Sequence, residues 1–417
     1  MNLVADLKAR GLVEHSSADI EKILGEKRTV YFGIDPSSDS PQIGNLAGIL
    51  LMRRLGEAGH KLIFIVGGGT GMIGDPREKG ERSLLDAKTL KHNTLGIKKN
   101  LKRLLGDSSF KLVDNADWLL KIDLFHFLRD IGKHFTVNDL IKRETIKKRL
   151  TTPDESISFT EFTYALLQGY DYMVLNKKYG CDLQIGGSDQ WTNILSGVEL
   201  IRKKEGKEAF AFTLPLITDS SGKKFGKSEG NAVWVDPEKT SPYTFYQFWL
   251  NVPDDSVEKY LYVYTFMPII EISALCELHK RNPGRREAQK ILAMKVTEIV
   301  HGSEAARSAE AVSEAIFGGR ELDTLSDKEK TLLLKEAPVT KVSRATLGDA
   351  WPVVEALVAS GLSASKSDAK RLISGNGVSV NGETCDGPEA SLSILDFPNG
   401  LALLRRGKQV AILAIEK

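Results

Sequence analysis

The sequence is poor in cysteine and has no long apolar run. Its 417 residues include three cysteines, Cys181, Cys276 and Cys385, which lie far apart and form no CxxC pair. This spacing excludes a disulfide framework and argues against a zinc knuckle or a thioredoxin-type motif. No segment reaches the roughly 18 apolar residues of a membrane-spanning helix, and the charged N-terminus lacks the apolar core of a secretory signal. We therefore expect a cytoplasmic protein with reduced thiols and no membrane partner.

The sequence also lacks an excess of either charge. The 57 Lys and Arg residues against 55 Asp and Glu residues give a formal net charge of +2, with 41% hydrophobic residues. This composition is typical of a folded globular protein and excludes a whole-surface polycation. It does not exclude nucleic acid as a partner, because a local basic face can be balanced by acids elsewhere.

Strands and helices alternate over the first half of the chain, with glycine-rich turns between them. This order is typical of an α/β fold with a parallel sheet. The predicted strands are 28–35 and 60–66, the predicted helices are 46–59 and 159–180, the glycine turn is 67–76, and strand–glycine–helix order returns over 181–204.

The remaining sequence suggests further divisions. We place a Rossmann-like domain at 1–220, with a basic, mostly helical insertion at about 83–150. A lysine–glycine loop and an α-helical domain occupy 221–320, and a linker follows over 321–350. Residues 351–417 form a small separate α+β unit.

Two segments are candidates for nucleotide binding. After the predicted strand 28–35, the polar loop 37–45 leads into a helix that begins near Gly44 and Asn45, where unpaired N–H groups and the helix dipole favour phosphate. An ordinary connection between strand and helix is the alternative. Residues 69–74 match the GxGxxG dinucleotide pattern, but no helix starts inside it and Asp86 does not end a second strand. An NAD oxidoreductase therefore fails on context.

The segment 220–228 contains three lysines and two glycines. Surface loops often have this composition. Two of its lysines could also close over a polyphosphate and stabilise the charge that develops on a leaving pyrophosphate.

Together these segments resemble a known family. YFGIDPSSDSPQIGNL resembles the HIGH segment of class I aminoacyl-tRNA synthetases, and KFGKS at 224–228 resembles their KMSKS loop. FTYALLQGYD and QIGGSDQWTN resemble the amino-acid and ribose pockets of bacterial tyrosyl-tRNA synthetases. The similarity covers essentially the whole chain. It implies a Rossmann-like catalytic domain, an α-helical anticodon-side domain and an S4-like RNA-binding domain.

The resemblance also implies a reaction and its partners. ATP would activate L-tyrosine to tyrosyl-adenylate and pyrophosphate, and the tyrosyl group would pass to the 3′-terminal adenosine of tRNA-Tyr. Mg²⁺ would arrive with ATP, and we expect neither a protein-bound metal nor a tightly bound cofactor. A homodimer is implied, and the stretch 121–136 is our candidate surface for it.

Each site residue takes its role from the resemblance. Tyr31 and Asp171 would hold the phenol hydroxyl of tyrosine, while Asp75, Tyr164 and Gln168 would surround its ammonium group. Gln190 would lie near its carboxylate, and Asp189 would accept from the ribose hydroxyls. The nucleotide loop would be lined by Gly33, Asp35, Ser37 and Gly44. The pyrophosphate would be met by Lys224, Lys227 and Ser228, with Lys79 and Arg82 as possible helpers there or at the tRNA end.

This chain departs from the family in the HIGH segment, which reads Gln42-Ile43-Gly44-Asn45 and has neither histidine. In the family the first histidine donates a hydrogen bond toward the ATP phosphates. Gln42 carries an NH₂ donor of similar reach, and Asn45 can also donate. A donor is what this step needs, so the amides could retain the role. A non-catalytic RNA-binding protein with the synthetase fold is the alternative function that this departure leaves open.

Several site residues also have a purely structural interpretation. Tyr164 and Gln168 could share a helix face in the core, Asp171 could cap a helix, and Asp75 before a proline could serve a turn.

The C-terminal unit contains a basic helix. Lys366, Lys370 and Arg371 fall on one side of a short helix, followed by a glycine turn and a strand. A solvated charged face is the simple alternative. The pattern resembles an S4 domain, which implies that these three residues bind RNA phosphates.

Overall fold

The computed structural model describes residues 2–75, 85–153, 155–218, 232–348 and 350–416. The chain divides into two compact units. The first comprises Met1–Thr240 and Val252–Ala288, and the second comprises Ser241–Asn251 and Gln289–Lys417. The α/β class expected from the sequence is confirmed, while the predicted boundaries at 220, 320 and 350 stay predictions. Within the described residues, no helix is both long enough and apolar enough to cross a membrane.

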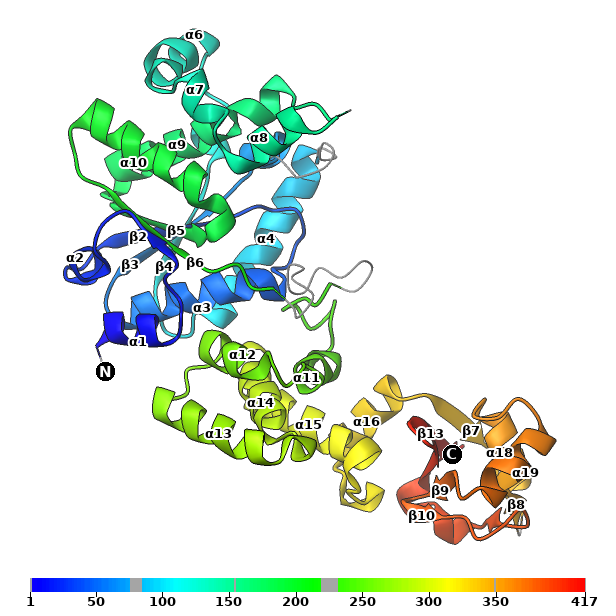
Figure 1. Ribbon diagram of the computed structural model, residues 1–417. Coiled ribbons are helices and arrows are strands. Elements are labelled where there is room, and N and C mark those ends of the chain that lie inside the picture. The colour runs from blue at the N-terminus through cyan, green and yellow to red at the C-terminus, as the bar shows by residue number, and fades with distance from the viewer. Residues whose placement is uncertain (1, 76–84, 154, 219–231, 349, 417) are drawn as a thin grey trace. The chain divides into compact units, whose positions relative to one another are not determined.

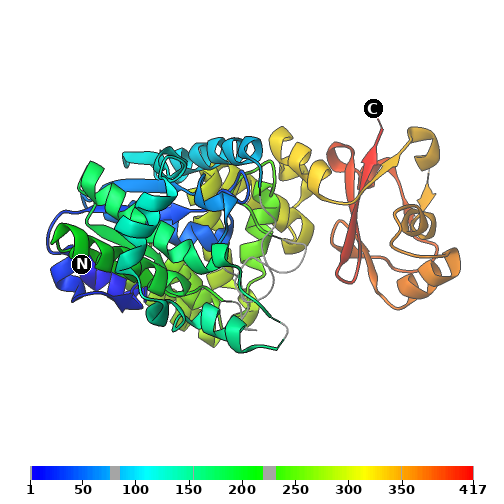
Figure 2. The ribbon, with the colours of Figure 1, turned by 90° about the horizontal axis from the view of Figure 1, so that it is seen from above.

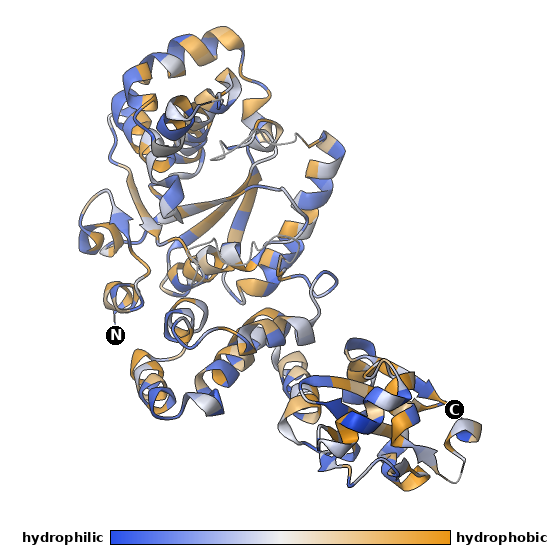
Figure 3. Cartoon of the chain, turned by 45° about the vertical axis from the view of Figure 1, so that its right-hand side comes forward, coloured by the Kyte–Doolittle hydropathy of each residue, from blue (hydrophilic) through white to orange (hydrophobic). Residues whose placement is uncertain are grey.

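A six-stranded sheet forms the centre of the first unit, in the order β1–β6–β5–β2–β3–β4 (Figure 1). The strands are β1 His15–Ser16, β2 Thr29–Ile34, β3 Lys61–Val66, β4 Phe110–Asp114, β5 Leu183–Gly187 and β6 Phe210–Leu214. Strands β2 to β6 run parallel to their neighbours, and β1 runs antiparallel to β6. The central strands are apolar on both faces, as parallel strands covered by helices must be, and Figure 3 shows them mostly in orange.

Helices cover both faces of this sheet. In Figure 1, α9 and α10 lie above the strands and α3 lies below them. The helices of this unit are α1 Leu3–Ala9, α2 Ile20–Leu24, α3 Ile43–Glu57, α4 Ala87–Leu104, α5 Ala116–Leu119, α6 Leu124–His126, α7 Val137–Leu140, α8 Glu144–Thr151, α9 Phe159–Tyr179, α10 Trp191–Glu205, α12 Val257–Tyr264 and α13 Ile269–Arg281.

The strand order contains a reversal that positions the site. From β2 the chain moves outward through β3 to β4, and then it returns to place β5 on the other side of β2. Ligands of open parallel sheets bind at the carboxyl ends of the strands where the order reverses in this way. The predicted elements at 28–35, 46–59, 60–66 and 159–180 are confirmed as β2, α3, β3 and α9. The supposed insertion at 83–150 is not wholly separate, because its residues 110–114 form β4 of the main sheet.

The second unit contains a second sheet, in the order β10–β9–β12–β13–β7. Helices α18 and α19 lie on one side of it (Figure 2), and their apolar residues share its core. The elements are α11 Pro242–Leu250, α14 Glu287–His301, α15 Ser303–Ser313, α16 Asp327–Glu336, β7 Val339–Val342, α17 Arg344–Leu347, β8 Trp351–Pro352, α18 Val353–Ala359, α19 Lys366–Ser374, β9 Val378–Val380, β10 Glu383–Thr384, β11 Ser391–Leu392, β12 Leu401–Arg406 and β13 Gln409–Ile415.

The segment 321–350 is not the plain linker that the sequence suggests. It contains α16 and strand β7, which pairs in parallel with β13. The reason is that β7 alternates exposed and less exposed positions and ends on the buried Val342, so it completes the edge of the C-terminal sheet.

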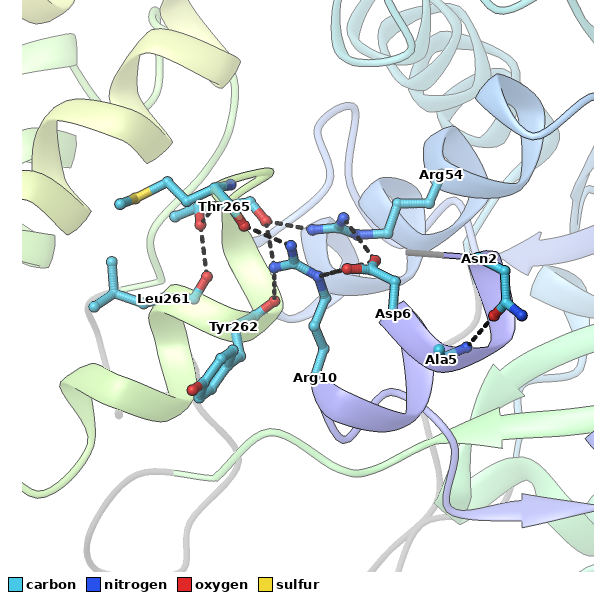
Figure 4. A network of polar contacts seen from close by, with 9 residues as sticks. Asn2, Ala5, Asp6, Arg10, Arg54, Leu261, Tyr262 and Thr265 are labelled. Carbon is cyan, nitrogen blue, oxygen red and sulfur yellow. Dashed lines mark hydrogen bonds and ion pairs between the residues drawn. The ribbon is translucent and has the colours of Figure 1, made fainter. Parts of the chain in front are cut away.

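Two buried arginines join the N-terminal helix of the first unit to the end of α12 (Figure 4). Arg10 donates to the carbonyls of Tyr262 (3.1 Å) and Thr265 (3.2 Å), and Arg54 of α3 also donates to the Thr265 carbonyl. Both guanidinium groups pair with the carboxylate of Asp6, at 2.8 Å and 3.4 Å. One carboxylate therefore balances two desolvated cations.

This arrangement predicts that Asp6→Ala destabilises the first unit. The substitution leaves Arg10 and Arg54 buried without an anionic partner, so we expect the free energy of unfolding to fall by about 1–3 kcal/mol. Urea unfolding followed by fluorescence measures this. The control is Glu21→Ala, which removes an exposed ion pair between Glu21 and Lys8 and should cause no measurable change. Equal effects of the two variants would contradict the assignment.

Candidate active site

The predicted site residues of the first unit gather at the carboxyl ends of its parallel strands. Asp35 follows β2, Asp75 ends the glycine-rich segment after β3, and Asp189 and Gln190 follow β5. Because β2, β3 and β5 are neighbours, these three loops meet at one edge of the sheet.

One small pocket at this edge contains several of them. Its lining includes Asp75, Tyr164 and Asp189, together with Arg143 and Asn193. Gln190 donates through Nε2 to Asp75 Oδ2 at 2.8 Å, and Asn193 donates through Nδ2 to Asp75 Oδ1 at 3.2 Å. Asp75 is therefore an acceptor in this pocket whose two oxygens are each oriented by an amide donor.

Asp171 lies deeper, in the middle of α9, with 4% of its surface exposed. The alternative that it caps a helix is therefore wrong. Trp118 Nε1 donates to Asp171 Oδ1 at 2.7 Å, and Asn115 Nδ2 donates to Oδ2 at 2.9 Å. Burial still raises the pKa of this carboxyl to about 7, helped by the negative charges of Asp35 and Asp114, although both hydrogen bonds act in the opposite direction.

The glycine turn after β3 holds Asn115 in place. The backbone N–H of Gly69 donates to Asn115 Oδ1 at 2.7 Å, so the amide must point its NH₂ group away, toward Asp171. Asp114 accepts from the N–H of Gly68 at 3.1 Å, and a Cβ on Gly68 would lie 2.2 Å from that carboxylate. Gly69, the first glycine of the GxGxxG pattern, thus makes the contact with Asn115, and only the short 3₁₀ turn Thr70–Met72 starts inside the pattern.

Tyr31 and Gly33 lie on the same face of β2, since side chains two residues apart in a strand share a face. Tyr31 is 1% exposed, and its ring meets that of Tyr172 on α9 at 5.1 Å between centroids. Its hydroxyl oxygen is buried and has no hydrogen-bond partner among the described residues. Burial, and then the charge of Asp171, raise its pKa well above the ordinary value. Gly33 is exposed, and because it has no side chain, nothing from this residue covers the neighbouring Ile65, which a Cβ would approach to 3.4 Å.

The HIGH-like segment forms the N-terminus of α3. Gln42 is the N-cap residue, and its backbone N–H donates to Asn45 Oδ1 at 3.3 Å. Gly44 and Asn45 are exposed, and so is Ser37 in the loop before them. The segment that follows the lysine loop pairs with this turn, because the Ile43 N–H donates to the Val233 carbonyl at 3.1 Å.

Two protein-family models match this chain. Residues 24–318 match the family of class I tRNA synthetases for tryptophan and tyrosine, and residues 330–414 match a tyrosine–tRNA ligase C-terminal domain. The chain belongs to the tyrosine–tRNA ligases. The NAD oxidoreductase hypothesis is thereby excluded.

Two bacterial relatives are similar in sequence over nearly the full length of the chain. A tyrosine–tRNA ligase of Vibrio parahaemolyticus is 44% identical, covering 98% of this chain and 97% of the relative, and one of Roseiflexus castenholzii is 43% identical with the same coverage. A C-terminally truncated mitochondrial tyrosyl-tRNA synthetase of Aspergillus nidulans is similar in structure. It has a TM-score of 0.67 and 31% identity, covering 75% of this chain and 94% of that protein.

Other predicted site residues of this ligase lie elsewhere or outside the described residues. Gln168 is half-buried on α9, one turn beyond the buried Tyr164 on the same helix face, and its assignment to the ammonium group stays a prediction. The catalytic candidates Lys224, Lys227 and Ser228, and the helpers Lys79 and Arg82, all lie outside the described residues.

The basic residues of the C-terminal helix are exposed on α19. Two of them have acidic neighbours, since Lys366 pairs with Glu355 at 2.6 Å and Arg371 with Asp368 at 2.6 Å.

Four polar residues of the site were missed by the sequence analysis: Asn115, Trp118, Arg143 and Asn193. A signal existed for two of them. Asn115 directly follows strand β4, and Asn193 lies three residues after Gln190 at the start of α10. Trp118 and Arg143 carry no comparable signal, because their roles depend on contacts between distant segments. No group of three potential metal ligands occurs within the described part of the chain.

The raised pKa of Asp171 predicts a pH dependence of stability. Its pKa rises from the ordinary 3.8 to about 7 on folding, so at pH 5 the folded state holds a proton that the unfolded state lacks. Stability therefore falls as pH rises from about 3.8 to about 7, and the part of this loss between pH 5 and pH 8 amounts to up to about 3 kcal/mol. Asp171→Asn cannot titrate and should remove this loss.

Urea unfolding at pH 5 and pH 8 measures the difference for each variant. Asp117→Asn is the matched control, because Asp117 is exposed on the neighbouring helix α5. The control should keep the pH dependence of the unmodified protein. The same pH dependence in Asp171→Asn would show that Asp171 does not titrate in this range.

Proposed function

We propose that this edge of the sheet binds L-tyrosine with its phenol toward Tyr31 and Asp171. The observation that carries the assignment is the Tyr31 hydroxyl, which is buried beside α9 without a hydrogen-bond partner among the described residues. Asp171 supplies an acceptor whose orientation is fixed by two donors. A phenol hydroxyl fits both groups, because it can donate to the carboxylate and accept from Tyr31.

This pair explains selection against phenylalanine. A ligand without a hydroxyl would leave two buried polar groups unpaired, which is costly. Tyrosyl-tRNA synthetases are the standard example of this kind of discrimination.

The amino-acid end of tyrosine would then lie in the pocket that contains Asp75. Asp75 shares this pocket with Tyr164, and a carboxylate suits the α-ammonium group, toward which Gln168 would also be directed. Gln190 would lie beside the substrate carboxylate, and Asp189, which is exposed after β5, would accept from the ribose hydroxyls of ATP.

ATP would lie along the loop from β2 to α3. Gly33, Asp35, Ser37 and Gly44 would line this path, and the positive end of the α3 helix dipole favours phosphate. Gln42 and Asn45 would donate to the phosphates as neutral amides. Lys224, Lys227 and Ser228 would meet the pyrophosphate, and Mg²⁺ would enter as part of the ATP complex.

The chemistry then needs positioning and charge stabilisation, with no covalent bond to the enzyme. A carboxylate oxygen of tyrosine attacks the α-phosphorus of ATP, and the bond to pyrophosphate breaks. A ribose hydroxyl of the terminal adenosine of tRNA-Tyr next attacks the carbonyl carbon of the adenylate, and AMP leaves.

We assign tRNA contacts to α19 of the C-terminal unit. Lys366, Lys370 and Arg371 are exposed there and can exchange intramolecular acids for RNA phosphates. The three cysteines are free and buried, which suits a reducing compartment, and we place the reaction in the cytoplasm.

Tyrosine-dependent exchange of pyrophosphate into ATP tests this function. We expect Tyr31→Phe to lower kcat/KM for tyrosine by about tenfold, because one hydrogen bond to the phenol is lost. The KM for ATP should stay the same. The ratio of kcat/KM for tyrosine to kcat/KM for phenylalanine should fall. No exchange by the unmodified protein would instead support the non-catalytic RNA-binding alternative.

A second copy of this chain is the partner that we propose for the segment around α6. Leu120, Leu124 and Phe125 are 62%, 66% and 82% exposed, within or next to the stretch 121–136. Leu128 and Val137 are also exposed. Apolar side chains gathered in this way indicate an interaction surface.

Phe125→Asp should therefore shift the protein toward the monomer. A charge placed in an apolar interface has no partner and must be desolvated, which weakens association. Sedimentation velocity at several concentrations measures the change. The control is Ile270→Asp, at an equally exposed position of α13 (79%). A monomeric unmodified protein, or a dimer unchanged by Phe125→Asp, would contradict this interface.

A further inference from the structure

Arg143, the residue before α8, reaches across to α10. Its Nη1 donates to Asn193 Oδ1 at 2.9 Å, and its Nη2 donates to Ser196 Oγ at 2.5 Å. Ser196 donates in turn to the carbonyl of Thr192 at 3.1 Å. One guanidinium group thus holds two side chains of the first turns of α10, and it also lines the pocket that contains Asp75.

These contacts fix the orientation of two amides. A guanidinium group has only donors, so Asn193 must turn its oxygen toward Arg143 and its NH₂ group toward the opposite side. There Nδ2 donates to Asp75 Oδ1 and to Gln190 Oε1, both at 3.2 Å. Because Gln190 thereby presents its oxygen to Asn193, its own Nε2 faces Asp75 Oδ2 at 2.8 Å.

The hydrogen bonds that link Arg143 to Asp75 through the two amides therefore have a fixed order of donors and acceptors. It begins at a group that can only donate, Arg143, and ends at one that can only accept, the Asp75 carboxylate. Reversing either amide would set oxygen against oxygen or donor against donor. Burial lowers the pKa of Arg143 to about 10, and the charge of Asp75 acts against this change, so the guanidinium stays charged at neutral pH.

We propose that Arg143 and Asn193 are positioning residues for the amino-acid end of tyrosine, since they orient the carboxylate of Asp75 and the amide of Gln190. The proposal rests on the function proposed above for Asp75 and Gln190. Without the guanidinium, both amides can rotate, and Asp75 no longer presents its oxygens in a single arrangement.

Kinetics of the exchange reaction give the first test. Arg143→Met removes the donors but keeps much of the side-chain length, and we expect the KM for tyrosine to rise about tenfold with the KM for ATP unchanged. Arg143→Lys should recover part of the loss, because a single donor can still reach Asn193 Oδ1. Arg202→Met is the control on α10, since Arg202 is exposed and pairs with Glu199; it should change neither constant.

Ligands that lack one polar group separate positioning from general damage. Tyramine lacks the carboxylate, and 3-(4-hydroxyphenyl)propionate lacks the ammonium group. We expect Arg143→Met to weaken the binding of tyrosine about tenfold and that of each analogue about threefold or less. Equal weakening of all three ligands, or no weakening of any, would overturn the proposal. Asn193→Ser should repeat the pattern if Arg143→Met folds poorly, as thermal unfolding would show.

Asp75→Asn in the same assay separates failure of this inference from failure of the site assignment. If Asp75→Asn does not reduce the preference for tyrosine over 3-(4-hydroxyphenyl)propionate, Asp75 does not bind the ammonium group, and the proposed site is wrong. If Asp75→Asn reduces the preference but Arg143→Met does not, only the positioning role is wrong.

Discussion

Asp171 lies in the interior of α9, where only 4% of its surface meets water. Burying a carboxylate costs several kcal/mol unless neighbouring groups compensate. Trp118 and Asn115 each donate to one of its oxygens, and Asn115 is itself held by the N–H of Gly69. The Asp171 carboxylate therefore depends on contacts from three segments: the glycine turn after β3, the residues that follow β4, and its own helix α9. The carboxylate receives both donors only where the folded sheet brings these three segments together.

In the pocket around Asp75, too, the groups that donate to a carboxylate are themselves held by other contacts. A carboxylate accepts from two amides, and each amide is held by a contact on its other side. In both places an asparagine turns its oxygen toward a fixed donor and its NH₂ group toward an aspartate. The donor is a backbone N–H for Asn115 and a guanidinium for Asn193. Neutral amides can thus orient a carboxylate without neutralising it, which leaves its charge to act on a cationic ligand.

Local sequence was sufficient to predict much of this arrangement. Apolar runs that end at glycine or aspartate predicted β2 and β3, and the helical spacing of 159–180 predicted α9. Asp75 and Gln190, assigned to one ligand, lie 2.8 Å apart. Arg143 could not be predicted, because its partners Asn193 and Ser196 follow some fifty residues later in the chain. Strand β7 was missed for a similar reason, since its four residues pair with β13, some seventy residues later in the chain.

The two ends of the proposed site respond differently to pH. Imidazole titrates near neutrality, whereas the amides of Gln42 and Asn45 keep the same donors across this range. In the tyrosine pocket, Asp171 has a pKa of about 7. A phenol that donates to this carboxylate stabilises its ionised form and lowers its pKa, so binding of tyrosine should release a proton near neutrality. The proposed tyrosine pocket should therefore contribute a pH dependence near neutrality that the amides of Gln42 and Asn45 do not contribute.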